Sequence, residues 1–462
     1  MESVGYPPFF LYAVLAGGVA LAAMRPYWAF LAAAALFGMT DSYTATLTRT
    51  ELLGPFFNLY DVLFLVSGMS ILLDRDSPPL YIPRPVEWLV LVLLMGSLTT
   101  AFAYEINYTV LRAIRWSITL PLAMVIGANS VVDFPRARQF LGALILGSAA
   151  SAFQGIYAYR QLTALRLAET AARLPGALPP MAVNFLVAAL QRPFFPMARW
   201  PLQLGWGLFL ISCGLGVLIT QWRAVFLGIA LTLLILPALL KQWRVLKRSL
   251  AITLLAVPLL LIIFKIALPA VNPLSAFNRL SLLGNYVQAD KAVPMEDQPR
   301  WRQIQRDVEE WSKGNWLIGR GLSFNAFLPD AGDHQVAWGH VGYAAYLSHF
   351  GLIGLAVFAL YLPIQLFLAG KKLFLQAPDD PAALLGLLTM VSVVMTSITS
   401  WMSTSYLSPL MHTTGLLYGA AWSLAHGEPG ALRPPGDHPV APGAGPAPPE
   451  PRPRHQGGVH GD

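Results

Sequence analysis

Apolar residues fall into long, nearly unbroken runs over the first 425 residues of this chain, and short polar turns separate the runs. Several runs reach the ~17–25 apolar residues that a helix needs to cross a bilayer. None has the alternating pattern of about ten residues that marks a membrane β-barrel. We therefore predict an all-α integral membrane protein with twelve transmembrane helices. The predicted spans are residues 8–24, 27–40, 52–73, 87–105, 109–128, 139–158, 203–220, 224–240, 249–268, 343–369, 382–400 and 406–425.

The basic residues of the loops predict the orientation of the C-terminal half, because Lys and Arg gather in cytoplasmic loops. Residues 241–248 (KQWRVLKR) hold four basic residues in eight, so we place them in the cytoplasm. Lys371-Lys372 fall on the same side two spans later. The large loop at 269–342, between the spans 249–268 and 343–369, is then external.

A thirteenth span is an alternative that this pattern leaves open. Residues 181–191 (MAVNFLVAALQ) are apolar but short, and could form a span with their neighbours. Such a span would reverse the orientation of everything before it, and would put Arg112 and Arg115 on the side of the large loop.

The arginines of the N-terminal half favour twelve spans, with eight in cytoplasmic loops against five in external loops. The eight are Arg49, Arg112, Arg115, Arg160, Arg166, Arg173, Arg192 and Arg199, and the five are Arg25, Arg75, Arg84, Arg136 and Arg138.

Composition supports lipid as the solvent, since 55% of the residues are hydrophobic and only 12% are charged, against about 25% in soluble domains. The net charge of +7 fits basic loops at membrane edges better than a nucleic-acid surface. The single cysteine, Cys213, excludes an intramolecular disulfide and a cysteine metal cluster. We expect a membrane domain at 1–426 that contains the large loop, and a Pro- and Gly-rich, disordered cytoplasmic tail at 427–462.

The large loop is predicted to contain a helix. Gln298-Pro299 can open it, because proline is tolerated in the first turn, and Gly314 can end it. Its apolar residues recur at helical spacing and predict one apolar face. They are Trp301, Ile304, Val308 and Trp311.

Arginines near this helix are candidate phosphate ligands. Arg302 and Arg306 are four residues apart and share a side, and Arg300 is nearby. A guanidinium offers a rigid fork of donors that suits phosphate oxygens. The alternative is a solvated face on which Arg306 pairs with Glu310. Arg223, between two apolar runs, is either functional or an anchor at the membrane edge.

Two further motifs frame the end of the large loop. Gly319 and Gly321 flank Arg320 and predict a tight turn after the helix. His340 begins HVGYAAYLSHFGLIGL at the start of a span, and Tyr343 shares its side one turn on. His349 faces the opposite side about 13 Å away, so the two histidines should not form one site. Histidine can exchange a proton near neutral pH, although a hydrogen-bonded interfacial histidine is an equal alternative.

A metal site is not expected. Asp330, Asp333 and His334 could ligate a cation, but a polar surface turn is the favoured interpretation.

Taken in order, three segments resemble the O-antigen ligase/polymerase family of bacterial envelope enzymes. They are TQWRAVFLGIAL, PRWRQIQRDVEEWSKGNWLIGRGLSF and HVGYAAYLSHFGLIGL. The likeness covers roughly residues 200–425 in these motifs and the N-terminal half only in hydropathy.

The resemblance implies a type C glycosyltransferase-like helical fold in the bacterial inner membrane, with its active site facing the periplasm or cell exterior. Such an enzyme takes a glycan from an undecaprenyl diphosphate carrier and passes it to an acceptor hydroxyl on a glycan or lipid, without a cofactor. The implied roles are diphosphate binding for Arg223 and for Arg300 or Arg302, and acceptor deprotonation for His340 with support from Tyr343. Arg306 is a further supporting residue. Membrane lipids and other polysaccharide-assembly proteins are expected partners, and nucleic acid is not.

The residues leave several readings open. Acceptor identity separates a polymerase, which we slightly prefer, from a ligase. A polysaccharide transporter or flippase without catalytic activity is the first alternative, and a membrane scaffold is the second. The lack of half-to-half repetition disfavours a transporter.

Overall fold

The fold is helical throughout the part of the chain that the structure, a computed structural model, describes. The described residues are 8–40, 59–75, 79–104, 108–164, 180–191, 200–220, 223–267, 298–322, 342–376, 380–401 and 411–427. Within these ranges no strand forms, and one isolated bridge joins Asn315 and Gly319. The predicted all-α class is therefore confirmed. The predicted disordered tail lies outside the described residues.

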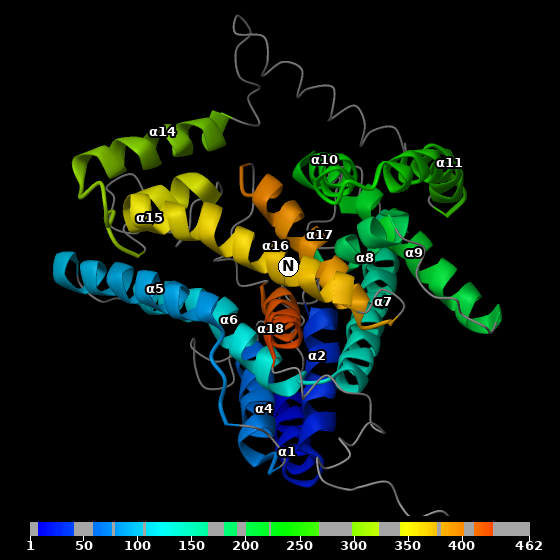
Figure 1. The fold of residues 1–462 in the computed structure, drawn as a ribbon, viewed down its shortest axis with the longest axis horizontal. Coiled ribbons are helices and arrows are strands. Elements are labelled where there is room, and N and C mark those ends of the chain that lie inside the picture. Colours follow the sequence, from blue (N-terminus) through cyan, green and yellow to red (C-terminus); the bar gives the residue numbers. More distant parts are fainter. Residues whose placement is uncertain are drawn as a thin grey trace, which may run out of the picture.

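Figure 1 labels most of the described helices. They are α1 (Pro8–Met24), α2 (Pro26–Thr40), α4 (Leu59–Leu73), α5 (Arg84–Ala103), α6 (Tyr108–Ser130), α7 (Phe134–Ala164), α8 (Pro180–Gln191), α9 (Trp200–Thr220), α10 (Arg223–Leu239), α11 (Trp243–Ala267), α14 (Gln298–Lys313), α15 (Gly342–Ala356), the π-helix η3 (Val357–Tyr361), α16 (Leu362–Gln376), α17 (Ala383–Thr399) and α18 (His412–His426).

Four of the described helical segments are long and apolar enough to cross a membrane. They are Arg84–Ala103, Phe134–Tyr157, Trp243–Ile263 and Gly342–Gln376, the last formed by α15, η3 and α16 together. Seven shorter helices of 10–17 residues are also apolar. These lengths do not confirm the predicted count of twelve spans.

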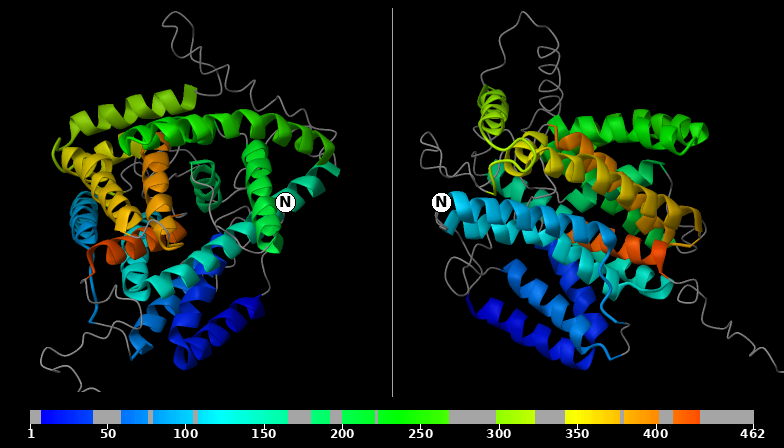
Figure 2. Two further views of the ribbon diagram at one scale, coloured as in Figure 1. Left: turned by 45° about the vertical axis from the view of Figure 1, so that its right-hand side comes forward. Right: turned by 60° about the vertical axis from the view of Figure 1, so that its left-hand side comes forward.

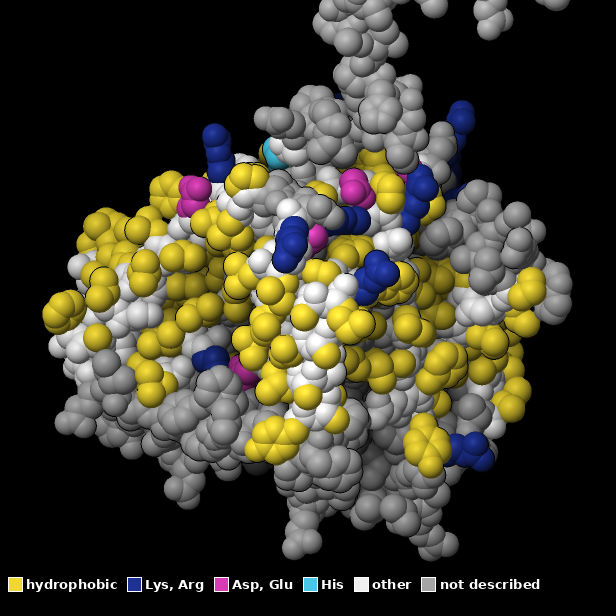
Figure 3. Space-filling model, turned by 90° about the horizontal axis from the view of Figure 1, so that it is seen from below, with side chains coloured by type: hydrophobic (Ala, Val, Ile, Leu, Met, Phe, Trp, Pro, Cys, Tyr) yellow, Lys and Arg dark blue, Asp and Glu magenta, His cyan; other side chains and the backbone are white. Residues whose placement is uncertain are grey.

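Large apolar side chains cover much of the outer surface (Figure 3). On α11, Leu254, Leu255 and Ile266 are each more than 70% exposed. Water penalises this much apolar exposure on one helix, whereas lipid does not. The exposed surface is thus typical of a membrane protein.

Close helix crossings in the interior depend on glycine. A Cβ at Gly419 of α18 would collide with the carbonyl of Met124 in α6, and one at Gly127 with the carbonyl of Leu416. Gly370 of α16 and Gly386 of α17 face each other in the same way. Small residues let backbones approach closely, as in membrane helix pairs.

Two contacts between segments far apart in the sequence bear on the topology of the N-terminal half. Arg138 at the start of α7 forms an ion pair with Asp380, between α16 and α17, and its Nε lies 3.1 Å from Oδ1. Tyr104, after α5, accepts a hydrogen bond of 3.2 Å from Arg320 of the large loop. Segments that touch lie on one side of a membrane, so an even number of spans must separate them.

The twelve-span prediction places five spans between each of these pairs. Counting α8 as a further membrane element makes both numbers even. In this thirteen-span alternative, the segment before Arg112 and Arg115 lies on the side of the large loop.

Candidate functional site

The predicted site residues are described unevenly by the structure. His340 lies outside the described residues, as do Asp330, Asp333 and His334. Arg223 is the first residue of α10, and Arg300 and Arg302 lie near the start of α14. For these three arginines the structure gives the backbone position. Side chains are described for Tyr343 and Arg306.

The predicted loop helix and the tight turn after it are both present. α14 ends where the amide of Gly314 donates to the Trp311 carbonyl at 3.1 Å. Gly319 and Gly321 have positive φ angles of 72° and 94°, which glycine adopts without strain. We call residues 314–322 the docking turn. Figures 1 and 2 show α14 lying across α15, with the docking turn beneath it.

The docking turn is bonded into a break in α15. At Gly351 the backbone leaves the helix, with φ 64° and ψ −159°. The amides of Arg320 and Gly321 donate to the carbonyls of Ser348 and His349 at 2.8 and 3.0 Å. The turn thus supplies hydrogen bonds that the break removes from the helix.

Amides of α15 also donate hydrogen bonds to the docking turn. The amides of Leu352 and Ile353, just after the break, donate to the carbonyls of Trp316 and Leu317 at 3.0 and 3.1 Å. His349 is fully buried, and its Nδ1 lies 3.2 Å from the Gly321 carbonyl oxygen. The second and third motifs of the resemblance are therefore one interlocked unit.

The end of the docking turn is also fixed to α5. The Leu322 amide donates to the Gly96 carbonyl at 3.1 Å, and Thr100 Oγ1 donates to the Leu322 carbonyl at 2.7 Å. At the other end, Glu310 of α14 pairs with Arg320 at 3.2 Å and with Lys313 at 2.9 Å. The alternative pairing of Arg306 with Glu310 is thus not the one formed.

Tyr343 joins the start of α15 to the end of α17. Its hydroxyl donates to the Ser397 carbonyl at 2.8 Å, and its ring packs on Trp401 with centroids 4.8 Å apart. The start of α10 approaches the same part of α17, because a Cβ at Gly228 would lie 3.2 Å from Thr399 Cγ2. α17 therefore contacts both α10, which begins at Arg223, and α15, which begins two residues after His340.

The buried face of α14 differs from the predicted apolar face. Val308 is 41% exposed, whereas Asp307 is 1% and Glu310 is 9% exposed. The apolar spacing predicted a face centred near Ile304 and Val308. The pairing of Glu310 with Arg320 and Lys313 instead turns the neighbouring face inward.

Asp307 is a residue that sequence reasoning missed. Neither of its carboxylate oxygens has a hydrogen-bond partner within the described part of the chain. Burial raises its pKa from about 4 to about 7, against the opposing charge of Arg306. A carboxyl group that titrates near neutral pH can exchange a proton in catalysis. An acidic residue three after Ile304 and four before Trp311, inside an apolar face, was the available signal.

Helical geometry separates Arg300 from Arg302. Arg300 is seven residues before Asp307, so the two positions lie about 20° apart around the axis. Arg302 is five residues before it and lies about 140° away. The position of Arg300, rather than that of Arg302, therefore shares the face that carries Asp307.

No group of three or more His, Cys, Asp or Glu residues could hold a metal ion among the residues described. A comparison with protein-family models finds no match to the sequence, and a comparison with curated proteins finds none.

Proposed function

We propose that this protein is a membrane glycosyltransferase of the O-antigen ligase/polymerase type, working at the external face of the bacterial inner membrane. Its donor is a glycan linked to undecaprenyl diphosphate, and its acceptor is a hydroxyl of another glycan or lipid. The polymerase form is slightly preferred.

The proposed reaction needs two kinds of groups. The bond between the anomeric carbon and the diphosphate oxygen breaks, and its electron pair stays on the diphosphate. Arg223 and Arg300 or Arg302 stabilise the negative charge that grows there. The acceptor oxygen bonds to the anomeric carbon, and its proton passes to His340. Asp307 is a second proton acceptor that we add to this set.

The interlocked docking turn is the observation that carries the proposal. It holds α14, with its arginines, against α15, the helix that begins two residues after His340. Two segments with candidate chemistry, separated by about 30 residues, are thereby kept close together. A scaffold needs no such fixed pairing of a polar loop helix with a broken span.

Complementation tests the proposal. A strain that lacks the gene would receive His340→Ala, Arg223→Ala, Arg300→Ala or Arg302→Ala, with Gln305→Ala on the exposed side of α14 as control. Surface glycan is read on gels, and the membrane level of each variant is measured. We expect normal protein levels with loss of glycan for His340→Ala and Arg223→Ala, and normal glycan for the control.

The remaining products separate the two forms of the enzyme. Single repeat units on the carrier indicate a polymerase, and long chains left on the carrier indicate a ligase. Normal glycan in both the His340→Ala and Arg223→Ala strains would reject the proposed site and leave the transporter or scaffold readings.

A further inference from the structure

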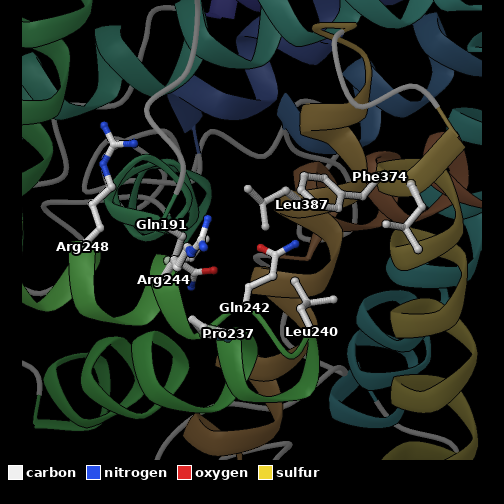
Figure 4. A pocket seen from close by; sticks show the side chains of 10 residues that line it. Gln191, Pro237, Leu240, Gln242, Arg244, Arg248, Phe374 and Leu387 are labelled. Atoms are coloured by element: carbon white, nitrogen blue, oxygen red, sulfur yellow. The ribbon is translucent and has the colours of Figure 1, made fainter.

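A cavity of about 430 Å³ lies away from the candidate site, where the end of α10 and the start of α11 meet α8, α16 and α17 (Figure 4). It is separated from Arg223 by the length of α10, about 24 Å. Its lining residues are Gln191, Pro237, Leu240, Gln242, Arg244, Val245, Arg248, Phe374, Leu375 and Leu387.

The positive charge at this cavity has no local counter-charge. Arg244 and Arg248 are four residues apart on the first turns of α11, so they share a side. The first turn of α11 holds no acidic residue, although the partial positive charge of a helix N-terminus favours one. No carboxylate lines the cavity, and neither arginine pairs with any carboxylate that the structure describes.

Gln191 adds a donor that lacks an acceptor. It is the last residue of α8 and is 4% exposed, and its Nε2 has no hydrogen-bond partner among the described residues. A buried donor without an acceptor is destabilising. Figure 4 shows the Gln191 side chain beside that of Arg244. Two arginines and an amide N–H therefore line a space that an anion with several oxygens would suit.

Apart from Gln242, the rest of the lining is apolar. Leu240, Phe374 and Leu387 form the opposite wall. Leu255 and Leu259, on the side of α11 that carries Arg248, continue an exposed apolar surface along the helix. A free phosphate would leave this wall in contact with water. A ligand that joins a phosphate to an acyl chain would cover it.

We propose that this cavity binds the phosphate headgroup of an anionic membrane phospholipid, with its acyl chain along α11. The site lies beside the basic segment 241–248, on the side that the loop charges assign to the cytoplasm. Anionic lipids concentrate in the cytoplasmic leaflet and attract such basic segments. The proposal rests on the apolar helices lying in a membrane and is independent of the proposed transferase chemistry.

The test uses the purified full chain in neutral detergent. Short-chain phosphatidylglycerol, short-chain phosphatidylcholine and inorganic phosphate are titrated separately, and the shift of the thermal-unfolding midpoint gives each apparent Kd. The double variant Arg244→Gln/Arg248→Gln is compared with Lys241→Gln/Lys247→Gln. The control removes the same charge from the same segment at exposed positions that do not line the cavity.

We expect phosphatidylglycerol to stabilise the wild-type chain more than phosphatidylcholine or phosphate does. The arginine pair variant should bind it at least about tenfold more weakly, and the lysine pair variant should bind it as the wild type does. Gln191→Leu should raise the midpoint without lipid and reduce the phosphatidylglycerol shift.

Equal shifts with the two lipids, or equal affinities in the two double variants, would overturn the proposal. A shift with phosphate as large as that with phosphatidylglycerol would reject a lipid in favour of a free anion.

Discussion

The burial of Asp307 makes the docking of α14 sensitive to pH. Its pKa of about 7 in the folded chain exceeds the value of about 4 expected in the unfolded chain. The unfolded state therefore loses its proton first as the pH rises. The folded state is destabilised between about pH 4 and pH 7, and the loss is complete above pH 7.

Asp307→Asn should remove this dependence, because the amide stays neutral. We expect the variant to be more stable than wild type at pH 8 by up to a few kcal/mol, with a smaller difference at pH 5. Thermal unfolding in detergent at both pH values measures it. Glu309→Gln, an exposed change on the same helix, should leave the pH dependence intact. A variant less stable than wild type at pH 8 would show that the carboxylate has a partner.

Gly351 is the residue on which the interlock depends. Its φ and ψ of 64° and −159° fall in a region that is essentially restricted to glycine. A Cβ there would overlap the Leu317 carbonyl and would lie 2.6 Å from the Gly319 amide nitrogen. The space and the conformation both exclude a side chain.

Gly351→Ala should therefore destabilise the docked turn by roughly 2–3 kcal/mol or more. We expect faster trypsin cleavage after Arg320, measured on the detergent-solubilised chain. Gly68→Ala in α4 is the matched control, since nothing lies within 4 Å of its added Cβ, and it should be neutral or stabilising. Equal cleavage of the two variants would mean that the turn is not held by α15.

At the scale of the element, the sequence predicted helices better than their faces or sides. The helix at 298–313 and the turn glycines follow from local rules, so both could be predicted. The inward face of α14 depends on Glu310 meeting Arg320 and Lys313, and on burial of Asp307, which apolar periodicity does not encode. His340 was identified from its motif, and it lies outside the described residues.

Loop charge leaves the span count open between twelve and thirteen. The counts of eight cytoplasmic against five external arginines become seven against six when 181–191 is included, so loop charge hardly distinguishes the two topologies. Contacts between distant segments, such as Arg138 with Asp380, bear on the choice.

Cysteine labelling tests this topology. In a chain with Cys213 replaced by Ser, we expect Arg138→Cys and Lys372→Cys to respond alike to a membrane-impermeant thiol reagent. Lys313→Cys, in the large loop, should respond oppositely. Intact cells and opened membranes supply the two measurements. Opposite responses of the first two positions would restore the twelve-span assignment.

For the whole molecule, the exposed apolar surface most directly supports a lipid environment. Leu255 lies at the middle of α11 and is 77% exposed. In lipid, Leu255→Arg should lower the membrane level of the protein, because arginine at mid-span costs about 2.5–3.5 kcal/mol. Trp243→Arg, at the start of the same helix, should be tolerated. Immunoblots of isolated membranes compare them, and equal levels would argue against a lipid-exposed α11.

The broken span also has a consequence for biosynthesis. Every partner that the break at Gly351 needs is made earlier in the chain, since α5 and the docking turn both precede α15. The ribosome therefore releases the backbone donors and acceptors of the docking turn before it releases residues 348–353, which bond to them. Their absence would leave four backbone groups, at residues 348, 349, 352 and 353, without the hydrogen bonds seen in the folded chain. Insertion of α15 into the membrane then depends on the earlier completion of the docking turn. A deletion within 314–322 should therefore halt assembly when α15 is made.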